Sequence, residues 1–218
     1  FIVRKAYEAK AKKYIRMDGR TNFGQGGAFH DIPYVIKNYG IVPQNVYTGL
    51  KKKSDTYNHS EMFNQLNEIV SNAKSEGKGI QQSWVESYNK VLDENIGELP
   101  ETFKFKGEKY TSQSFYKSLG IDMNDYLSIT SFTNHPMYSK CMLEIPDNWL
   151  WDESYNVSVD EMYETVLHAL KSGYTVAWGA DVSEKGFSFK NGLAIVPLRK
   201  EKIVVEGEDN KNFSDAGA

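Results

Sequence analysis

The sequence is poor in cysteine, with one thiol, Cys141, in 218 residues. A single thiol excludes an internal disulfide framework and a metal site made from several cysteines. The sequence also lacks an apolar run of about 18–20 residues, the length that a bilayer-spanning helix requires. The N-terminus begins with Phe1 and shows neither an initiator Met nor a secretory signal. We therefore expect no membrane contact, and a processed or truncated start.

An excess of positive charge is absent as well, since 26 Lys and Arg residues stand against 29 Asp and Glu and the formal net charge is −3. This balance offers little for neutralising phosphates, so a nucleic-acid partner is not expected. The four histidines show neither a pair four residues apart nor a carboxylate–histidine motif; they are His30, His59, His135 and His168. We therefore expect no metal and no other cofactor.

The sequence does contain the material for a core, with 40% apolar and 13% aromatic residues, enough for one large domain or two small ones. Apolar residues at helical spacing, several of them followed by glycine, predict helices at 1–16, 28–39, 62–73, 84–92, 112–119 and 159–170. Ser158 and Glu161 form a capping box at the start of the last of these. Apolar stretches also predict strands at 126–132, 141–145, 174–182 and 186–196, the last two buried.

A glycine-rich turn, Gly24-Gln25-Gly26-Gly27, precedes the second predicted helix. It lacks the spacing of a dinucleotide-binding loop and the Lys-Ser/Thr of a P-loop. Glycine allows a ligand backbone to approach closely, because no Cβ intervenes. The residues alone leave two interpretations open, an ordinary turn before a helix or a cradle for a peptide backbone.

Cys141 stands in an alternating segment with Leu143 and Ile145, so we expect it to pack in a core as a small apolar residue. A nucleophilic cysteine would need a thiolate, supported by a paired histidine. Core packing is also expected for the aromatic residues of the last third, Trp149, Trp151, Trp178, Phe187 and Phe189.

Three segments together resemble the papain-like cysteine peptidases. Residues 23–47 (FGQGGAFHDIPYVIKNYGIVPQNVY) are similar to the stretch in which a diglycine turn opens a helix. Residues 173–197 (GYTVAWGADVSEKGFSFKNGLAIVP) are similar to the later segment in which a strand supplies part of the substrate pocket. The run SITSFTNHPMYSKCMLEIPDNWLW at 128–151 most resembles bleomycin hydrolase and bacterial aminopeptidase C.

The resemblance implies an α+β fold, an incomplete papain-like domain with a helical insertion. Its implied parts are a helical half at 1–50, the helical insertion at 51–118, a strand-rich barrel half at 119–200 and a polar, flexible end at 201–218. The family's catalytic cysteine precedes the stretch that matches residue 1, and its histidine and asparagine follow the stretch that matches residue 200. We therefore expect a fragment without catalytic residues of its own.

The implied function of the complete protein is that of a cysteine aminopeptidase, which hydrolyses peptide bonds at peptide N-termini through a thiol acyl-enzyme. The resemblance further implies a peptide substrate, the missing parts of the same polypeptide as partners, a homo-oligomer (a hexamer in the family) and a cytoplasmic location. The alternative is a non-catalytic papain-like module for binding or assembly. Substrate-binding residues carried over from the resemblance are Gly26, Gly27, Ala28, Phe29 and Gly179.

These expectations lead to a first test on the 218-residue chain. We expect the purified chain to hydrolyse no fluorogenic aminoacyl amide, because losing members of a catalytic triad typically lowers the rate by several orders of magnitude. Thiol-dependent turnover that disappears in Cys141→Ser would contradict the interpretation of Cys141 as a core residue.

Overall fold

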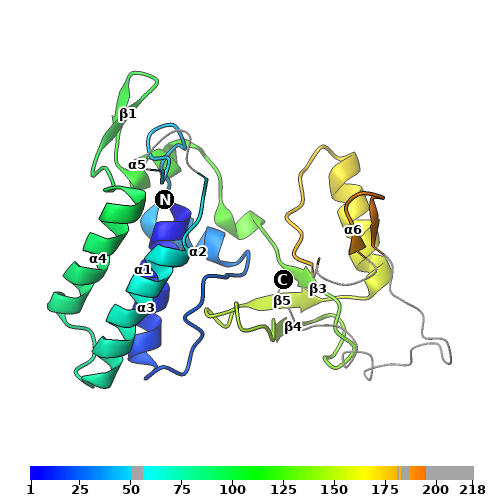
Figure 1. Cartoon of the computed structure of the whole chain (residues 1–218). Helices are drawn as coiled ribbons and strands as arrows, with labels where there is room; N and C mark the ends of the chain where they lie inside the picture. The colour runs from blue at the N-terminus through cyan, green and yellow to red at the C-terminus, as the bar shows by residue number, and fades with distance from the viewer. Residues whose placement is uncertain (51–55, 181, 183–186, 195–218) are drawn as a thin grey trace. The chain divides into compact units, whose positions relative to one another are not determined.

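The computed structural model describes residues 1–50, 56–180, 182 and 187–194. The chain divides into two compact units, Phe1–Tyr126 and Leu127–Ala218, and each is described by itself (Figure 1). None of the helices in the described residues is long and apolar enough to cross a bilayer.

The first unit is mainly helical. Its elements are α1 (Ile2–Arg16), α2 (Asp31–Tyr39), α3 (Ser60–Ser75), α4 (Gln82–Ile96), the hairpin of β1 (Phe103–Phe105) and β2 (Glu108–Tyr110), α5 (Ser112–Ser118) and the 3₁₀ turn η1 (Met123–Asp125). Helices α1, α3 and α4 pack on one another, and α2 lies against α1 (Figure 1). The predicted helices of this unit are confirmed, each displaced by only a few residues at its ends.

One apolar face on each of the three packed helices builds the main core. On α3 the buried residues Met62, Leu66, Val70 and Ala73 recur every three or four positions, the spacing of one helix face. They meet Tyr7 from α1 and residues of α4, where the Tyr88 hydroxyl donates to the Tyr7 carbonyl at 3.0 Å. The core is therefore formed by helices distant in sequence, which fixes α1 from two sides.

A second cluster of buried side chains involves a hairpin that was not predicted. Phe103 in β1 and Phe115 in α5 pack with Val42 and Tyr47. The turn between the strands consists of Lys106 and Gly107, both with positive φ (50° and 91°), the backbone of a type I′ turn. The range 51–118, predicted as helical, thus also contains a two-stranded sheet.

The second unit is built on a small mixed sheet. Its strands β3 (Ile129–Thr130), β4 (Ser139–Met142) and β5 (Glu153–Asn156) have the order β3-β5-β4, with β3 parallel and β4 antiparallel to β5. Helix α6 (Val159–Lys171) follows, and β6 (Phe187–Ser188) pairs with β7 (Leu193–Ala194). The predicted capping box is confirmed, because the Ser158 hydroxyl accepts from the Glu161 N–H and the Glu161 carboxylate accepts from the Ser158 N–H.

Two predictions for this unit were wrong. Residues 174–180 and 182 contain no strand and are mostly exposed, although a buried strand was predicted at 174–182. The strand predicted at 186–196 is a two-stranded ribbon with Leu193 48% exposed, and positions 186, 195 and 196 lie outside the described residues. A two-stranded ribbon has no second layer of its own, so its apolar side chains find cover only where another element packs on it.

Of the aromatic residues that were predicted to lie in the core, some are buried and others are exposed. Trp149 is 1% exposed, as predicted, and Phe187 is partly buried. Trp151, Trp178 and Phe189 are 45%, 72% and 80% exposed, so their prediction as core residues was wrong for the described part of the chain. Apolar character alone did not distinguish the buried Trp149 from the exposed Trp151, which lies two residues further along the same connection between β4 and β5.

Two buried asparagines hold the loops around the mixed sheet. The Asn156 side chain, fully buried, accepts from the Phe132 N–H at 2.7 Å, and its amide nitrogen lies 2.8–3.2 Å from the carbonyls of Phe132, His135 and Pro136. Asn148 likewise donates to the carbonyls of Leu143 and Asp152, both at 2.9 Å. These two asparagines, one in the connection from β4 to β5 and one at the end of β5, therefore serve as hydrogen-bond partners of loop backbone in place of secondary structure.

We expect Asn156→Ala to lower the free energy of unfolding of the second unit by about 3 kcal/mol, because the loop backbone of Phe132, His135 and Pro136 loses several hydrogen bonds at once. The control Asn134→Ala removes an exposed side chain whose single contact, with Glu144, is 3.5 Å long, so a change below about 0.5 kcal/mol is expected. Urea denaturation followed by tryptophan fluorescence measures both. Equal effects of the two substitutions would contradict the role given to Asn156.

Candidate functional site

The candidate site lies on the connection from α1 to α2. Helix α1 ends in a left-handed turn at Asp18 and Gly19, where the Gly19 N–H donates to the Tyr14 carbonyl at 2.8 Å. Phe23 then anchors the connection in the main core, stacked on Phe63 with ring centroids 5.5 Å apart. This anchor places the glycine-rich turn directly after it against α1.

Lys10 of α1 contacts the glycine-rich turn from its buried side. Its side chain is buried, with 3% of the residue exposed, and its Nζ donates to the Gly24 carbonyl at 3.1 Å and to the Gly26 carbonyl. The ammonium also lies 6.0 Å from the centre of the Tyr7 ring. Burial raises the pKa of Tyr7 to about 12, so Tyr7 stays neutral at physiological pH and contributes its ring and not a charge.

The predicted residues of the turn divide into exposed and buried positions. Gly26 and Gly27 are exposed, and Phe29 is 50% exposed. Ala28 is buried, and its carbonyl accepts from the Asp31 N–H at 3.0 Å, so this residue serves the start of α2. The structure therefore brings together two exposed glycines and one half-exposed aromatic side chain in a continuous stretch.

A steric constraint explains why position 27 is a glycine. A Cβ at position 27 would lie 2.5 Å from Oδ2 of Asp31, closer than real Cβ contacts. Asp31 is itself 7% exposed, so its carboxylate has little room to move aside. Gly27 thus lets the turn approach α2 closely.

Gly179 belongs to the second unit. It is exposed and stands in the stretch 174–180 that forms no strand. Its role in substrate binding stays a prediction.

Sequence reasoning missed Lys10, whose ammonium donates to two carbonyls of the turn. A signal was present, because Lys10 stands three residues after Tyr7 and four before Tyr14, on the apolar face of α1. A lysine on an apolar stripe requires buried partners for its ammonium. Which backbone carbonyls supply them is set by a connection distant from Lys10 in sequence, and periodicity does not reveal that.

Cys141 is buried in β4, as predicted. Burial raises the pKa of its thiol, and the negative charges of Glu144 and Glu153 raise it further. Both causes favour the protonated thiol, whereas a nucleophilic cysteine needs the thiolate. The nearby His135 is paired instead with Glu144, with Nε2 and Oε2 3.3 Å apart.

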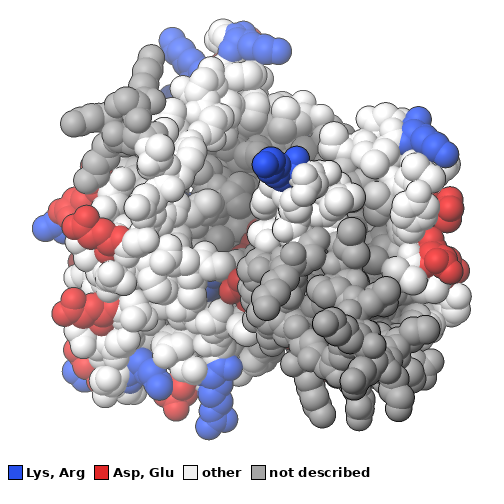
Figure 2. All heavy atoms as spheres, turned by 45° about the vertical axis from the view of Figure 1, so that its right-hand side comes forward, with Lys and Arg blue, Asp and Glu red and all other residues white. Residues whose placement is uncertain are grey.

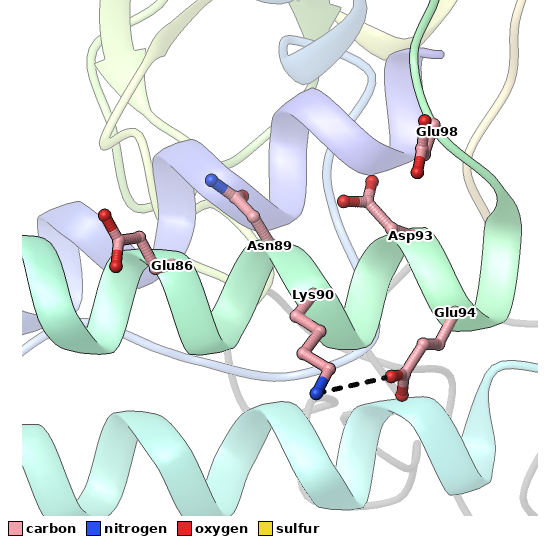
Figure 3. A pocket seen from close by; sticks show the side chains of 6 residues that line it. All are labelled: Glu86, Asn89, Lys90, Asp93, Glu94 and Glu98. Atoms are coloured by element: carbon pink, nitrogen blue, oxygen red, sulfur yellow. Dashed lines mark ion pairs between the residues drawn. The ribbon is translucent and has the colours of Figure 1, made fainter.

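The electrostatics of the described surface are mixed. On the face in Figure 2, basic and acidic side chains are interspersed, and the described residues form no continuous field of one sign. A pocket of about 490 Å³ lies along α4, lined by Glu86, Asn89, Lys90, Asp93, Glu94 and Glu98 (Figure 3). Two of its acidic groups are paired, Asp93 with Arg4 at 2.6 Å and Glu94 with Lys90 at 3.9 Å. Within the described residues no group of three or more His, Cys, Asp or Glu side chains is arranged to hold a metal ion.

The environment of Cys141 predicts low reactivity. In the folded chain, we expect alkylation by iodoacetamide at pH 8 to be at least about tenfold slower than in urea, because the thiol is buried and its thiolate fraction is reduced. Mass spectrometry of quenched samples gives both rates. Alkylation as fast in the folded as in the unfolded chain would show that the thiol is accessible and activated.

The chain is similar in sequence to several proteins named "Aminopeptidase C". The chain is 24% identical over 200 residues to "Aminopeptidase C" of Lactobacillus delbrueckii subsp. lactis, which covers 76% of this chain and 43% of the relative. The corresponding protein of Lactococcus lactis subsp. cremoris is 25% identical over 182 residues, covering 73% of this chain and 42% of its own length. That of Streptococcus thermophilus is 21% identical over 195 residues, covering 78% and 44%. The chain thus spans less than half the length of these relatives.

The family comparison covers nearly the whole chain and agrees with the predicted resemblance. The Peptidase C1-like family model matches residues 2–212. The six α-helices and small sheets of the described residues agree with the predicted α+β class. On this match, which includes the glycine turn, the buried asparagines and Cys141, the chain belongs to the Peptidase C1-like family.

Proposed function

We propose that this chain is part of a cysteine aminopeptidase, in which the glycine turn binds the backbone of a peptide substrate. The observation that carries the proposal is the exposed pair Gly26 and Gly27, held by a buried lysine and followed by the half-exposed Phe29. Family membership supports a peptidase, and the relatives named "Aminopeptidase C" support action at peptide N-termini.

The proposed reaction proceeds through a thiol acyl-enzyme. A cysteine thiolate attacks the carbonyl carbon of the first peptide bond, the shortened peptide leaves as an amine that takes up a proton, and water then releases the amino acid. Cys141 is not proposed as this nucleophile, because burial and two carboxylates favour its protonated form. We propose that the nucleophile and its histidine belong to parts of the complete protein outside these 218 residues.

Substrate binding at the turn follows from its exposed backbone. An extended peptide can pair its N–H and C=O groups with an exposed backbone edge, and glycine leaves room for this approach. The side chains of Phe29 and Ile32, 50% and 41% exposed, would contact an apolar substrate side chain next to the paired backbone. We retain Gly179 as a proposed floor of the specificity pocket, and a cytoplasmic homo-oligomer, hexameric as in the family, as the proposed assembly.

The test uses the complete protein and a fluorogenic aminoacyl-peptide substrate. We expect thiol-dependent hydrolysis, and we expect Gly26→Val to raise KM at least about tenfold with kcat within about threefold, because the branched side chain blocks backbone approach. The control Thr133→Val places the same side chain at another exposed position, in a loop of the second unit, and should leave both constants unchanged.

Two results would contradict the proposal. An unchanged KM in Gly26→Val would show that the substrate does not contact the turn. Tight peptide binding by a complete protein that shows no thiol-dependent hydrolysis would favour the alternative, a non-catalytic papain-like binding module.

A further inference from the structure

We propose that Lys10 is a positioning residue for peptide binding, whose ammonium orients the glycine turn so that the Gly27 N–H faces the substrate backbone. This inference rests on the proposed function, because it assigns a cause to the binding geometry of the same turn. Lys10 itself would not touch the substrate, because it is buried beneath the turn.

Lys10 carries its positive charge at a buried position. An ammonium removed from water is tolerated only when hydrogen bonds and favourable electrostatics compensate the lost hydration. Lys10 is 3% exposed, and the carbonyls of Gly24 and Gly26 and the face of the Tyr7 ring surround its Nζ. A turn conformation that withdrew these carbonyls would remove two of the hydrogen bonds that compensate the charge, so Lys10 restricts a segment that its glycines would otherwise leave free.

The peptide groups after Gly24 and Gly26 have a direction that their carbonyls reveal. The described residues contain no cis peptide bond, and the C=O and N–H of a trans peptide point in opposite directions. The Gly26 carbonyl points to Lys10, so the N–H of the same peptide group, which belongs to Gly27, points away from Lys10. The Gly24 carbonyl has the same direction, which turns the Gln25 N–H away as well.

The two N–H donors, those of Gln25 and Gly27, have a spacing that suits an extended peptide. Gln25 and Gly27 are both exposed and stand two residues apart. An extended peptide presents the backbone groups of alternate residues on one side, so a spacing of two suits pairing with its carbonyls. One ammonium with several N–H donors can hold both carbonyls at once, which a single hydroxyl donor cannot do.

The experiment compares Lys10→Met with Lys12→Met in the complete protein. Methionine keeps the unbranched apolar stem of lysine and removes the ammonium. Lys12 lies on the same helix, is partly exposed and has no hydrogen bond to the turn, so its substitution controls for loss of a charge from α1. If Lys10→Met fails to fold, Lys10→Gln, which keeps an amide donor for one carbonyl, takes its place.

The first readout does not depend on turnover. For Lys10→Met, amide hydrogen exchange in a peptide covering 22–30 should become at least about tenfold faster, while exchange in α3 and α4 stays unchanged. Lys12→Met should leave both regions unchanged. Unchanged exchange at 22–30 in Lys10→Met would overturn the proposal, whether or not the protein proves to be a peptidase.

The second readout separates positioning from stability. We expect Lys10→Met to raise KM, or the Kd of a fluorescent peptide measured by anisotropy, at least about tenfold with kcat within about threefold. Added to Gly26→Val, Lys10→Met should raise KM by much less than its effect alone, because both substitutions act through one turn. Multiplicative effects, or a fall in kcat with unchanged KM and Kd, would overturn the proposal. Absence of hydrolysis by the unsubstituted complete protein would refute only the proposed function, since exchange and peptide binding still decide the role of Lys10.

Discussion

The need to compensate buried charge governs the first unit of this protein. Helix α1 carries two cations at buried positions, Arg4 at 5% and Lys10 at 3% exposure. Arg4 meets Asp93 at 2.6 Å and the Gly97 carbonyl at 2.9 Å, so it fixes the end of α4 as well as its own helix. Lys10 meets two carbonyls of the glycine turn. Because an uncompensated buried charge would cost several kcal/mol, the positions of α4 and of the turn follow from those of two side chains on α1.

In the second unit, neutral side-chain amides serve instead as hydrogen-bond partners of loop backbone. Asn156 and Asn148 contact loop backbone where the strands are too short to do so, β3 having only two residues and β5 four. An amide has both donors and an acceptor, so one buried asparagine can hold two sides of a loop. This explains why the mixed sheet keeps its register with few ladder hydrogen bonds. Asn148 lies in the PDNW run at 146–149, in the connection between β4 and β5.

Prediction from the sequence succeeded where local rules determine the structure. It failed where packing or pairing with other elements determines it. Apolar periodicity and a following glycine predicted α2 and α4, because Gly40 and Gly97 adopt the positive φ that ends a helix. The segment 174–182 has the composition of a strand but is mostly exposed in its described residues, because a strand forms only with a pairing partner. At the site, the exposed glycines were predicted from the resemblance and Lys10 was missed. Its partners are backbone carbonyls, which any sequence supplies.

The glycines of the turn and the lysine beneath it have opposite physical effects, and the proposed binding of a peptide by this turn requires both. Glycine removes the side chains that would block a ligand, but it also leaves the backbone free, and ordering a free segment on binding lowers affinity. A buried ammonium restores order without occupying the exposed side, because it contacts the carbonyls from the interior. The turn can therefore be open to a ligand and fixed in conformation at the same time. A serine or alanine turn would not need the lysine to the same degree, so the buried cation on the apolar face of α1 is itself a reason to regard the glycines as a binding surface and not as an ordinary connection.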